Sequence, residues 1–104
     1  MDLPSLDRFA DPTVLILSSL AGGDKHGYAL IKDIEEIAGA TLGPGTLYGA
    51  LSRLVQHGLI EALPTQDRRR PYQITAAGAE AARAYLLHVQ RVATVGLKRL
   101  QAYA

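Results

Sequence analysis

The sequence contains no cysteine and no tryptophan among its 104 residues. Without cysteine the chain can form neither disulfide bonds nor thiolate metal sites, and this composition suits a reducing compartment. No run of eighteen apolar residues occurs, so we expect no transmembrane helix. The N-terminal residues carry early acidic side chains and lack the apolar segment of a secretory signal. The sequence therefore predicts one small cytoplasmic domain with no membrane partner.

Motifs of catalysis and metal binding are missing as well. We find no G-x-S-x-G elbow, no Walker loop and no G-x-G-x-x-G fingerprint, and no carboxylate stands beside a plausible nucleophile in a known motif. His26, His57 and His88 are far apart and show no ligand spacing such as H-x-x-x-H. We expect neither an enzyme nor a bound metal or cofactor.

The formal net charge of +1 hides an uneven distribution. Residues 1–36 carry seven acidic and three basic side chains, whereas residues 37–104 carry three acidic and eight basic ones. Such a division fits a polyanionic partner on one face of the molecule. Ordinary solvated surface charge is nevertheless the better explanation when the totals are considered alone.

Apolar spacing and capping residues predict two helices in the first part of the chain. Asp11 precedes a proline and a dense apolar run that stops at Gly22, which is typical of a capped and mostly buried helix. Asp24 is expected to cap the second helix, and Gly39 to end it. The apolar stripe of this second helix recurs at helical spacing, with Tyr28, Ile31, Ile34 and either Ile37 or Ala38 as its members.

The stretch GPGTLYGALSRLVQHGLI, residues 43–60, predicts a third helix with two different faces. Pro44 fits its first turn and Gly58 the position after its last residue. The expected apolar stripe consists of Leu47, Leu51, Leu54 and Val55. The opposite face consists of Gly45, Thr46, Gly49, Ser52, Arg53, Gln56 and His57. Tyr48 lies on the flank, where it could contact DNA or cover the core.

The polar face of this third helix has the residue types of a DNA-reading surface. Glycine inside a helix costs up to ~1 kcal/mol relative to alanine, so Gly45 and Gly49 suggest that another molecule approaches closely. The hydroxyl groups of Thr46 and Ser52 suit phosphates and base edges, and Arg53 could reach a phosphate or a guanine. A surface helix that packs its small residues against a neighbour explains the pattern equally well when it is considered alone.

A β-hairpin is predicted next, with strands over residues 60–63 and 70–74 and a loop over residues 64–69. Pro71 favours an edge position for the second strand, because proline cannot donate to the ladder. Three neighbouring cations, Arg68, Arg69 and Arg70, repel one another unless an anion is near, so this wing is expected to contact DNA. A merely soluble loop tip is the alternative. Tyr28 and Tyr72 could each be a core residue or a DNA contact.

The last part of the chain predicts a long helix over residues 76–103, capped by Thr75. A heptad seam runs along it, formed by Ala82, Leu86, Val89, Ala93, Gly96, Leu100 and Tyr103. At 1.5 Å per residue this helix would be roughly 42 Å long, which is more than a domain of this size can cover. A second copy of the chain is the simplest way to bury the seam.

The predicted fold class is mostly α with a small β-hairpin wing. We expect an arm or short helix over residues 1–10, a winged helix-turn-helix DNA-binding domain over residues 11–75, and a C-terminal dimerisation helix over residues 76–104. Such a domain is suited to bind double-stranded DNA, because a major groove about 12 Å wide admits one helix.

Three stretches together resemble the PadR family of bacterial transcriptional regulators: HGYALIKDIEE (26–36), LGPGTLYGALSRLVQHGLIE (42–61) and RRPYQITAAG (69–78). The resemblance covers about residues 11–90 and points to a short form of the family. It implies a homodimeric repressor on a palindromic operator, with the C-terminal helix as dimerisation element. It also implies DNA contacts from Tyr28, from Thr46, Tyr48 and their neighbours, and from the wing arginines.

The sequence departs from the family pattern at Gly43, where a serine-like cap is common. Family members often release DNA on binding a small molecule. Because the chain has no tryptophan, a tryptophan-lined pocket between subunits is not available. Whether this chain binds a small-molecule effector is left open. The alternative function is a winged-helix module that binds a protein partner and no DNA.

Overall fold

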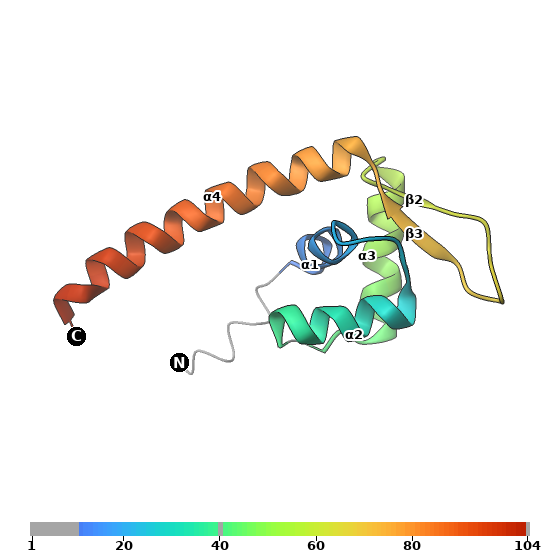
Figure 1. The fold of residues 1–104 in the computed structure, drawn as a ribbon, viewed down its shortest axis with the longest axis horizontal. Helices are drawn as coiled ribbons and strands as arrows, with labels where there is room; N and C mark the ends of the chain where they lie inside the picture. The colour runs from blue at the N-terminus through green and yellow to red at the C-terminus, as the bar shows by residue number, and fades with distance from the viewer. Residues whose placement is uncertain (1–10, 40, 104) are drawn as a thin grey trace.

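The computed structural model describes residues 11–39 and 41–103, so the predicted N-terminal arm lies outside the described residues. The order of elements is α1 (Pro12–Leu20), β1 (Lys25–His26), α2 (Gly27–Ala38), α3 (Pro44–Gln56), β2 (Ile60–Ala62), β3 (Pro71–Ile74), α4 (Ala76–Leu100) and a short 3₁₀ turn, η2 (Gln101–Tyr103). Figure 1 shows α1, α2 and α3 gathered beside the small sheet, with α4 running away from them as a long arm. The predicted mostly helical, winged architecture is confirmed.

Most helix ends follow the predicted caps. The Asp11 carboxylate accepts a hydrogen bond from the backbone N–H of Thr13 at 2.9 Å, at the start of α1. Thr75 does the same for α4, where its hydroxyl accepts from the N–H of Gly78 at 3.0 Å. Gly39, with φ of 65°, and Gly58, with φ of 71°, adopt the left-handed conformation that ends a helix. The α4 helix itself ends at Leu100, three residues before the predicted end.

The predicted cap of α2 is wrong. The residue at the N-cap is His26, whose ring Nδ1 lies 3.4 Å from the backbone nitrogen of Ala29, and not Asp24. Asp24 lies too early, because Lys25 and His26 are drawn into a short strand, β1, before the helix begins. The Asp24 carboxylate instead accepts a hydrogen bond from the Gln73 side chain at 3.4 Å.

The core lies between α1, α2 and α3 and is closed by the sheet and the first turns of α4. Its buried apolar members are Ile16, Leu17, Leu20, Leu30, Ile34, Leu47, Ala50, Leu51, Leu54, Ile60 and Ala82. Two predicted stripe positions on α2 point outward instead: Tyr28 and Ile37 are exposed, and Leu30 takes the inner position. The true inner face of α2 is therefore rotated away from the predicted stripe.

The sheet has three antiparallel strands in the order β1-β3-β2. Tyr72 of β3 pairs with Lys25 on one side and with Ala62 on the other. The prediction that Pro71 places its strand at the edge is therefore wrong, because β3 is the central strand. Pro71 is tolerated there as the first residue of the strand, and its carbonyl accepts from the N–H of Leu63 at 2.9 Å.

Among the described residues, α4 is buried only near its start, at Gly78 and Ala82. From Arg83 onward every described residue of α4 except the half-buried Gly96 is exposed. The molecule is accordingly elongated, with extents of 54 × 27 × 20 Å. Figure 1 shows the wing and the end of α4 pointing in opposite directions from the helical core. No helix in the described part of the chain is long and apolar enough to cross a membrane.

Candidate nucleic-acid interface

The α3 helix presents a small and polar outer face, as its sequence predicts. Gly45, Thr46, Ser52 and Arg53 are exposed, and Leu47, Ala50, Leu51 and Leu54 are buried against the core. The prediction for Val55 is wrong, because it is 40% exposed, and Ala50 completes the inner stripe instead. An alanine Cβ at the half-buried Gly49 would lie 3.7 Å from Nη1 of Arg53, so the arginine side chain extends across this glycine.

The start of α3 has no side-chain cap. Gly43 occupies the N-cap position, and no side chain accepts a hydrogen bond there, while Pro44 opens the helix. The first N–H groups of a helix carry partial positive charge and have no partner within the helix. This end of α3 is therefore suited to a phosphate, and Thr46 lies in the same turn.

The wing ends in a tight two-residue turn. The backbone N–H of Gln66 donates to the carbonyl of Arg69 at 2.7 Å, and the N–H of Arg69 donates to the carbonyl of Gln66 at 2.8 Å. Asp67 and Arg68 between them have φ angles of 50° and 65°. Two successive left-handed residues make a type I′ turn, in which glycine is preferred at the second of these positions. Arg68 thus occupies a strained place at the tip of the wing.

The three wing arginines are exposed, and none of them pairs with a carboxylate of the described residues. Among residues 11–39 and 41–103, the single ion pair joins Lys25 and Asp33, whose Nζ and Oδ2 atoms are 3.9 Å apart. Arg70 donates a hydrogen bond to the carbonyl of Leu63 at 3.3 Å, which holds it along the hairpin. The positive charge of the wing is therefore available to an external anion.

The wing arginines and three tyrosines meet around one small hollow of ≈ 190 Å³. Its lining consists of His26, Gly27, Tyr28, Tyr48, Arg68, Arg69, Arg70 and Tyr72. It therefore joins the start of α2, the flank of α3 and the wing. Six of these eight residues were predicted as DNA contacts from the sequence. His26 and Gly27 were not, although both stand in the HGY segment that carried part of the family resemblance.

Tyr48 lies over the backbone of Gly27 at the edge of this hollow. A Cβ atom built on Gly27 would be 3.1 Å from Cζ of Tyr48 and closer still to its hydroxyl oxygen, at 2.5 Å. Tyr48 is nevertheless 52% exposed, so it covers the start of α2 and also faces solvent. Tyr28 is 62% exposed, with Nζ of Lys32 at 5.4 Å from its ring centre. Tyr72, by contrast, is half-buried and packs against the core.

The structure separates the predicted seam of α4 into two parts. Ala82 is 8% exposed and belongs to the core of its own chain. The large seam residues that follow it, Leu86, Val89, Leu100 and Tyr103, are exposed, with Tyr103 at 85%. A groove of ≈ 520 Å³ runs between α1 and α4, and Leu17, Ala82 and Leu86 contribute to its lining. The arm therefore carries an apolar surface that residues 11–39 and 41–103 leave exposed.

Comparison with known proteins agrees with this geometry. The family model described as "Transcriptional regulator PadR-like family" matches residues 16–84, which run from the middle of α1 through α2, α3 and the wing to the start of α4. The chain belongs to the PadR-like family of transcriptional regulators. A crystal structure of a PadR family transcription regulator from Clostridium difficile is similar, with a TM-score of 0.76 and 26% identity over 86% of this chain and 97% of the other.

Two curated proteins are similar to part of this chain. An uncharacterised 37.1 kDa protein in transposon TN4556 of Streptomyces fradiae is 47% identical over 73 residues, which are 70% of this chain. The transcriptional activator GvpE2 of Halobacterium salinarum is 32% identical over 72 residues, which are 69% of this chain. The chain spans 21% of the length of the first protein and 36% of the length of the second.

Proposed function

We propose that this PadR-like chain binds double-stranded DNA in a sequence-specific manner as a homodimer and represses transcription from a palindromic operator. The observation that carries the proposal is the hollow at the junction of α2, α3 and the wing, where Tyr28, Tyr48 and the three wing arginines meet. These residues lie far apart in the sequence, and each has a side chain suited to phosphates or bases.

The proposed docking places the outer face of α3 in the major groove. Thr46, Ser52 and Arg53 are exposed on that face, and the leucines behind them attach the helix to the core. In this arrangement Arg68 and Arg69 follow the sugar–phosphate backbone or enter the neighbouring minor groove. Phosphate contacts would then position the protein, and the side chains of α3 would read the sequence.

A salt titration with duplex DNA tests the binding proposal. Operator fragments are selected from genomic DNA by binding, and fluorescence anisotropy then measures affinity between low and moderate salt. We expect affinity to fall steeply as salt rises, and Arg69→Ala to reduce the log–log slope by about one, because one phosphate contact is lost. Arg91→Ala, which changes an exposed arginine on α4, is the matched control and should leave the slope unchanged.

Two results would contradict this proposal. A slope that does not change in Arg69→Ala would mean that the wing is only a solvated loop. Failure to retain any duplex at low salt, together with binding of an acidic protein partner, would favour the alternative of a protein-interaction module.

The dimer is proposed to form along the exposed part of α4. This helix has 25 residues, or about 37 Å at 1.5 Å per residue, and nearly all of it from Arg83 onward is exposed in the described part of the chain. A dimer of this kind would place two α3 helices in successive major grooves, about 34 Å apart on one side of the DNA.

Light scattering tests the dimer. Leu86→Arg should give monomers, because a charge in an apolar seam is desolvated without a partner. Thr94→Arg changes an exposed position of the same helix outside the seam and should remain dimeric. A dimer that persists in Leu86→Arg and in Val89→Arg would show that the interface lies elsewhere.

Repression, rather than activation, is tested with a reporter gene placed behind the selected operator. Occupation of the operator should lower expression, and deletion of the gene for this chain should raise it. The name of GvpE2 describes an activator. A rise in expression with the chain present would therefore mean that this chain activates transcription instead of repressing it. A small-molecule effector would be recognised as a compound that lowers DNA affinity in the anisotropy assay.

A further inference from the structure

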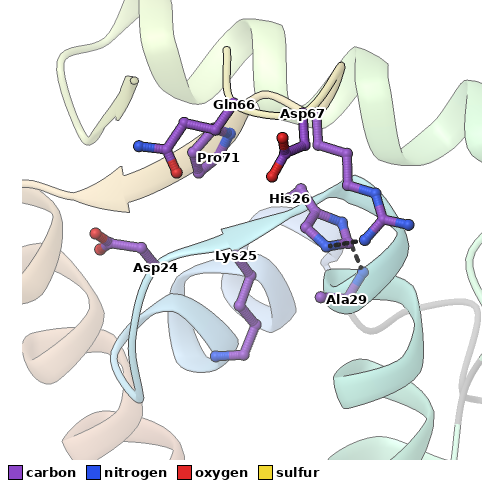
Figure 2. Close-up of a pocket in the computed structure, with 8 residues that line it drawn as sticks. Asp24, Lys25, His26, Ala29, Gln66, Asp67 and Pro71 are labelled. Atoms are coloured by element: carbon purple, nitrogen blue, oxygen red, sulfur yellow. Dashed lines mark hydrogen bonds between the residues drawn. The ribbon is translucent and has the colours of Figure 1, made fainter. Parts of the chain in front are cut away.

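His26 is placed where the wing meets the start of α2. Its backbone belongs to β1 and pairs with Pro71 of the central strand, and the residue is also the N-cap of α2. Its ring stands between two N–H donors: Nδ1 is 3.4 Å from the backbone nitrogen of Ala29, and Nε2 is 3.3 Å from Nη1 of Arg69. Figure 2 shows the ring of His26 with both of these contacts.

These two contacts exclude each other in a neutral ring. A neutral imidazole has one nitrogen that carries a proton and one that accepts, while both Ala29 N–H and Arg69 N–H are donors. The tautomer with the proton on Nε2 can cap α2 but cannot accept from Arg69. The tautomer with the proton on Nδ1 can accept from Arg69 but leaves the cap unmade. The position of one proton therefore decides which contact forms.

The surrounding charges do not relieve this competition. Lys25 is held by the carbonyls of Ser19 and Gly23, at 2.6 and 3.2 Å. Within residues 11–39 and 41–103, His26 is the only hydrogen-bond partner of the Arg69 guanidinium. Asp67 lines a second hollow, of ≈ 470 Å³, together with His26 and Arg69, but forms no ion pair with this guanidinium. An arginine with one weak partner is free to leave it for a phosphate, because charge-assisted bonds to anions are stronger.

We infer that His26 is a positioning residue that couples the wing to α2 through its tautomer. In the free protein its Nε2 holds Arg69 over the start of α2. When an anion takes Arg69, the proton of the ring moves from Nδ1 to Nε2, and Nδ1 then caps the helix that carries Tyr28. This inference rests on the DNA binding proposed above, since the DNA phosphate is the anion that would take Arg69.

Long-range ¹H–¹⁵N correlation spectra of the full chain test the coupling without DNA. The ring nitrogen shifts report the tautomer, and a pH of 8 or above keeps an ordinary imidazole neutral. Arg69→Ala should raise the ratio of the Nε2–H to the Nδ1–H tautomer of His26 by at least about threefold, the effect of one hydrogen bond. His88, exposed on α4, is the internal control and should not change. Equal tautomer ratios in wild type and Arg69→Ala would overturn the inference.

The same spectra with saturating operator DNA test the functional side. Wild-type His26 should move towards the Nε2–H tautomer on binding, and Arg69→Ala, already shifted, should change little. If the chain binds no DNA but Arg69→Ala shifts the tautomer, the coupling stands and the proposed function fails. If the chain binds DNA and His26 keeps its tautomer ratio, the coupling plays no part in binding and the inference is refuted.

His26→Asn separates the two roles of the ring. An asparagine side chain can accept from the N–H of Ala29 and so cap α2 in place of the lost contact, but it is too short to reach Arg69 as the imidazole does. We expect His26→Asn to keep the thermal midpoint of wild type, whereas His26→Ala, which lacks both contacts, lowers it. A His26→Asn variant as unstable as His26→Ala would show that the ring acts through packing, against the inference.

Discussion

Replacement of Gly78 by alanine should break the junction between the wing and α4. Gly78 is buried in the first turn of α4, where a Cβ atom would lie 2.0 Å from the carbonyl oxygen of Leu59 and 3.0 Å from Cγ1 of Ile74. The first of these neighbours is backbone and cannot rotate away. The helix would have to move by about 1.4 Å to restore an ordinary contact of 3.4 Å.

Such a movement strains two hydrogen bonds at the same junction. The N–H of Thr75 donates to the carbonyl of Leu59 at 3.1 Å, and the Thr75 hydroxyl donates to the carbonyl of Gly58 at 2.7 Å. Overpacking costs about 1–3 kcal/mol, and each weakened bond adds about 0.5–1.5 kcal/mol. The higher helix propensity of alanine offsets at most ~1 kcal/mol. We expect a net loss of about 3 kcal/mol in the free energy of unfolding.

Thermal unfolding followed by circular dichroism measures this loss. For a domain of this size, 3 kcal/mol corresponds to a fall in Tm of roughly 10–20 °C. Gly45→Ala is the matched control near the start of another helix, α3, because a Cβ there meets nothing within 4 Å, and it should leave Tm unchanged or raise it. A Tm for Gly78→Ala within a few degrees of wild type would refute the close approach of α4 to the Leu59 carbonyl.

Two further substitutions test the DNA-facing side. Gly27→Ala should lower DNA affinity with little loss of stability, because its Cβ displaces the exposed ring of Tyr48. In a double-mutant cycle, Gly27→Ala should cause no further loss of DNA affinity when Tyr48→Ala is already present. If the losses of DNA affinity in the two single variants add up in the double variant, Gly27→Ala does not act through its contact with Tyr48. Arg68→Gly should raise stability by up to ~1 kcal/mol, because it relieves the left-handed φ of 65°, yet weaken DNA binding by the anisotropy assay. Unchanged affinity would mean that the tip carries its strain for another reason.

Local signals in the sequence were sufficient for much of the fold. The caps at Asp11 and Thr75 and the glycine ends of α2 and α3 were predicted, because each depends on a few neighbouring residues and the backbone groups that they satisfy. The two faces of α3 follow from helical periodicity, and only Val55 was assigned to the wrong side.

Longer-range features could not be predicted in this way. The two-residue strand β1 is too short to leave a pattern of its own and forms only because β3 lies beside it. Its formation moves the cap of α2 from Asp24 to His26, and it makes β3 central in spite of Pro71. Both errors therefore have one cause, which is a pairing between residues more than forty positions apart.

The sequence by itself determined the order of the helices and the hairpin, the polar outer face of α3, the charge of the wing and the apolar character of the long helix. These properties depend on composition and on the spacing of residues within one or two helical turns. Only the tertiary structure decided that Tyr48 lies on Gly27, that three tyrosines and three arginines surround one hollow, and that His26 stands between Ala29 and Arg69. Such contacts depend on how separate elements pack, because the distance between two side chains on different elements is set by the whole core and not by either sequence segment.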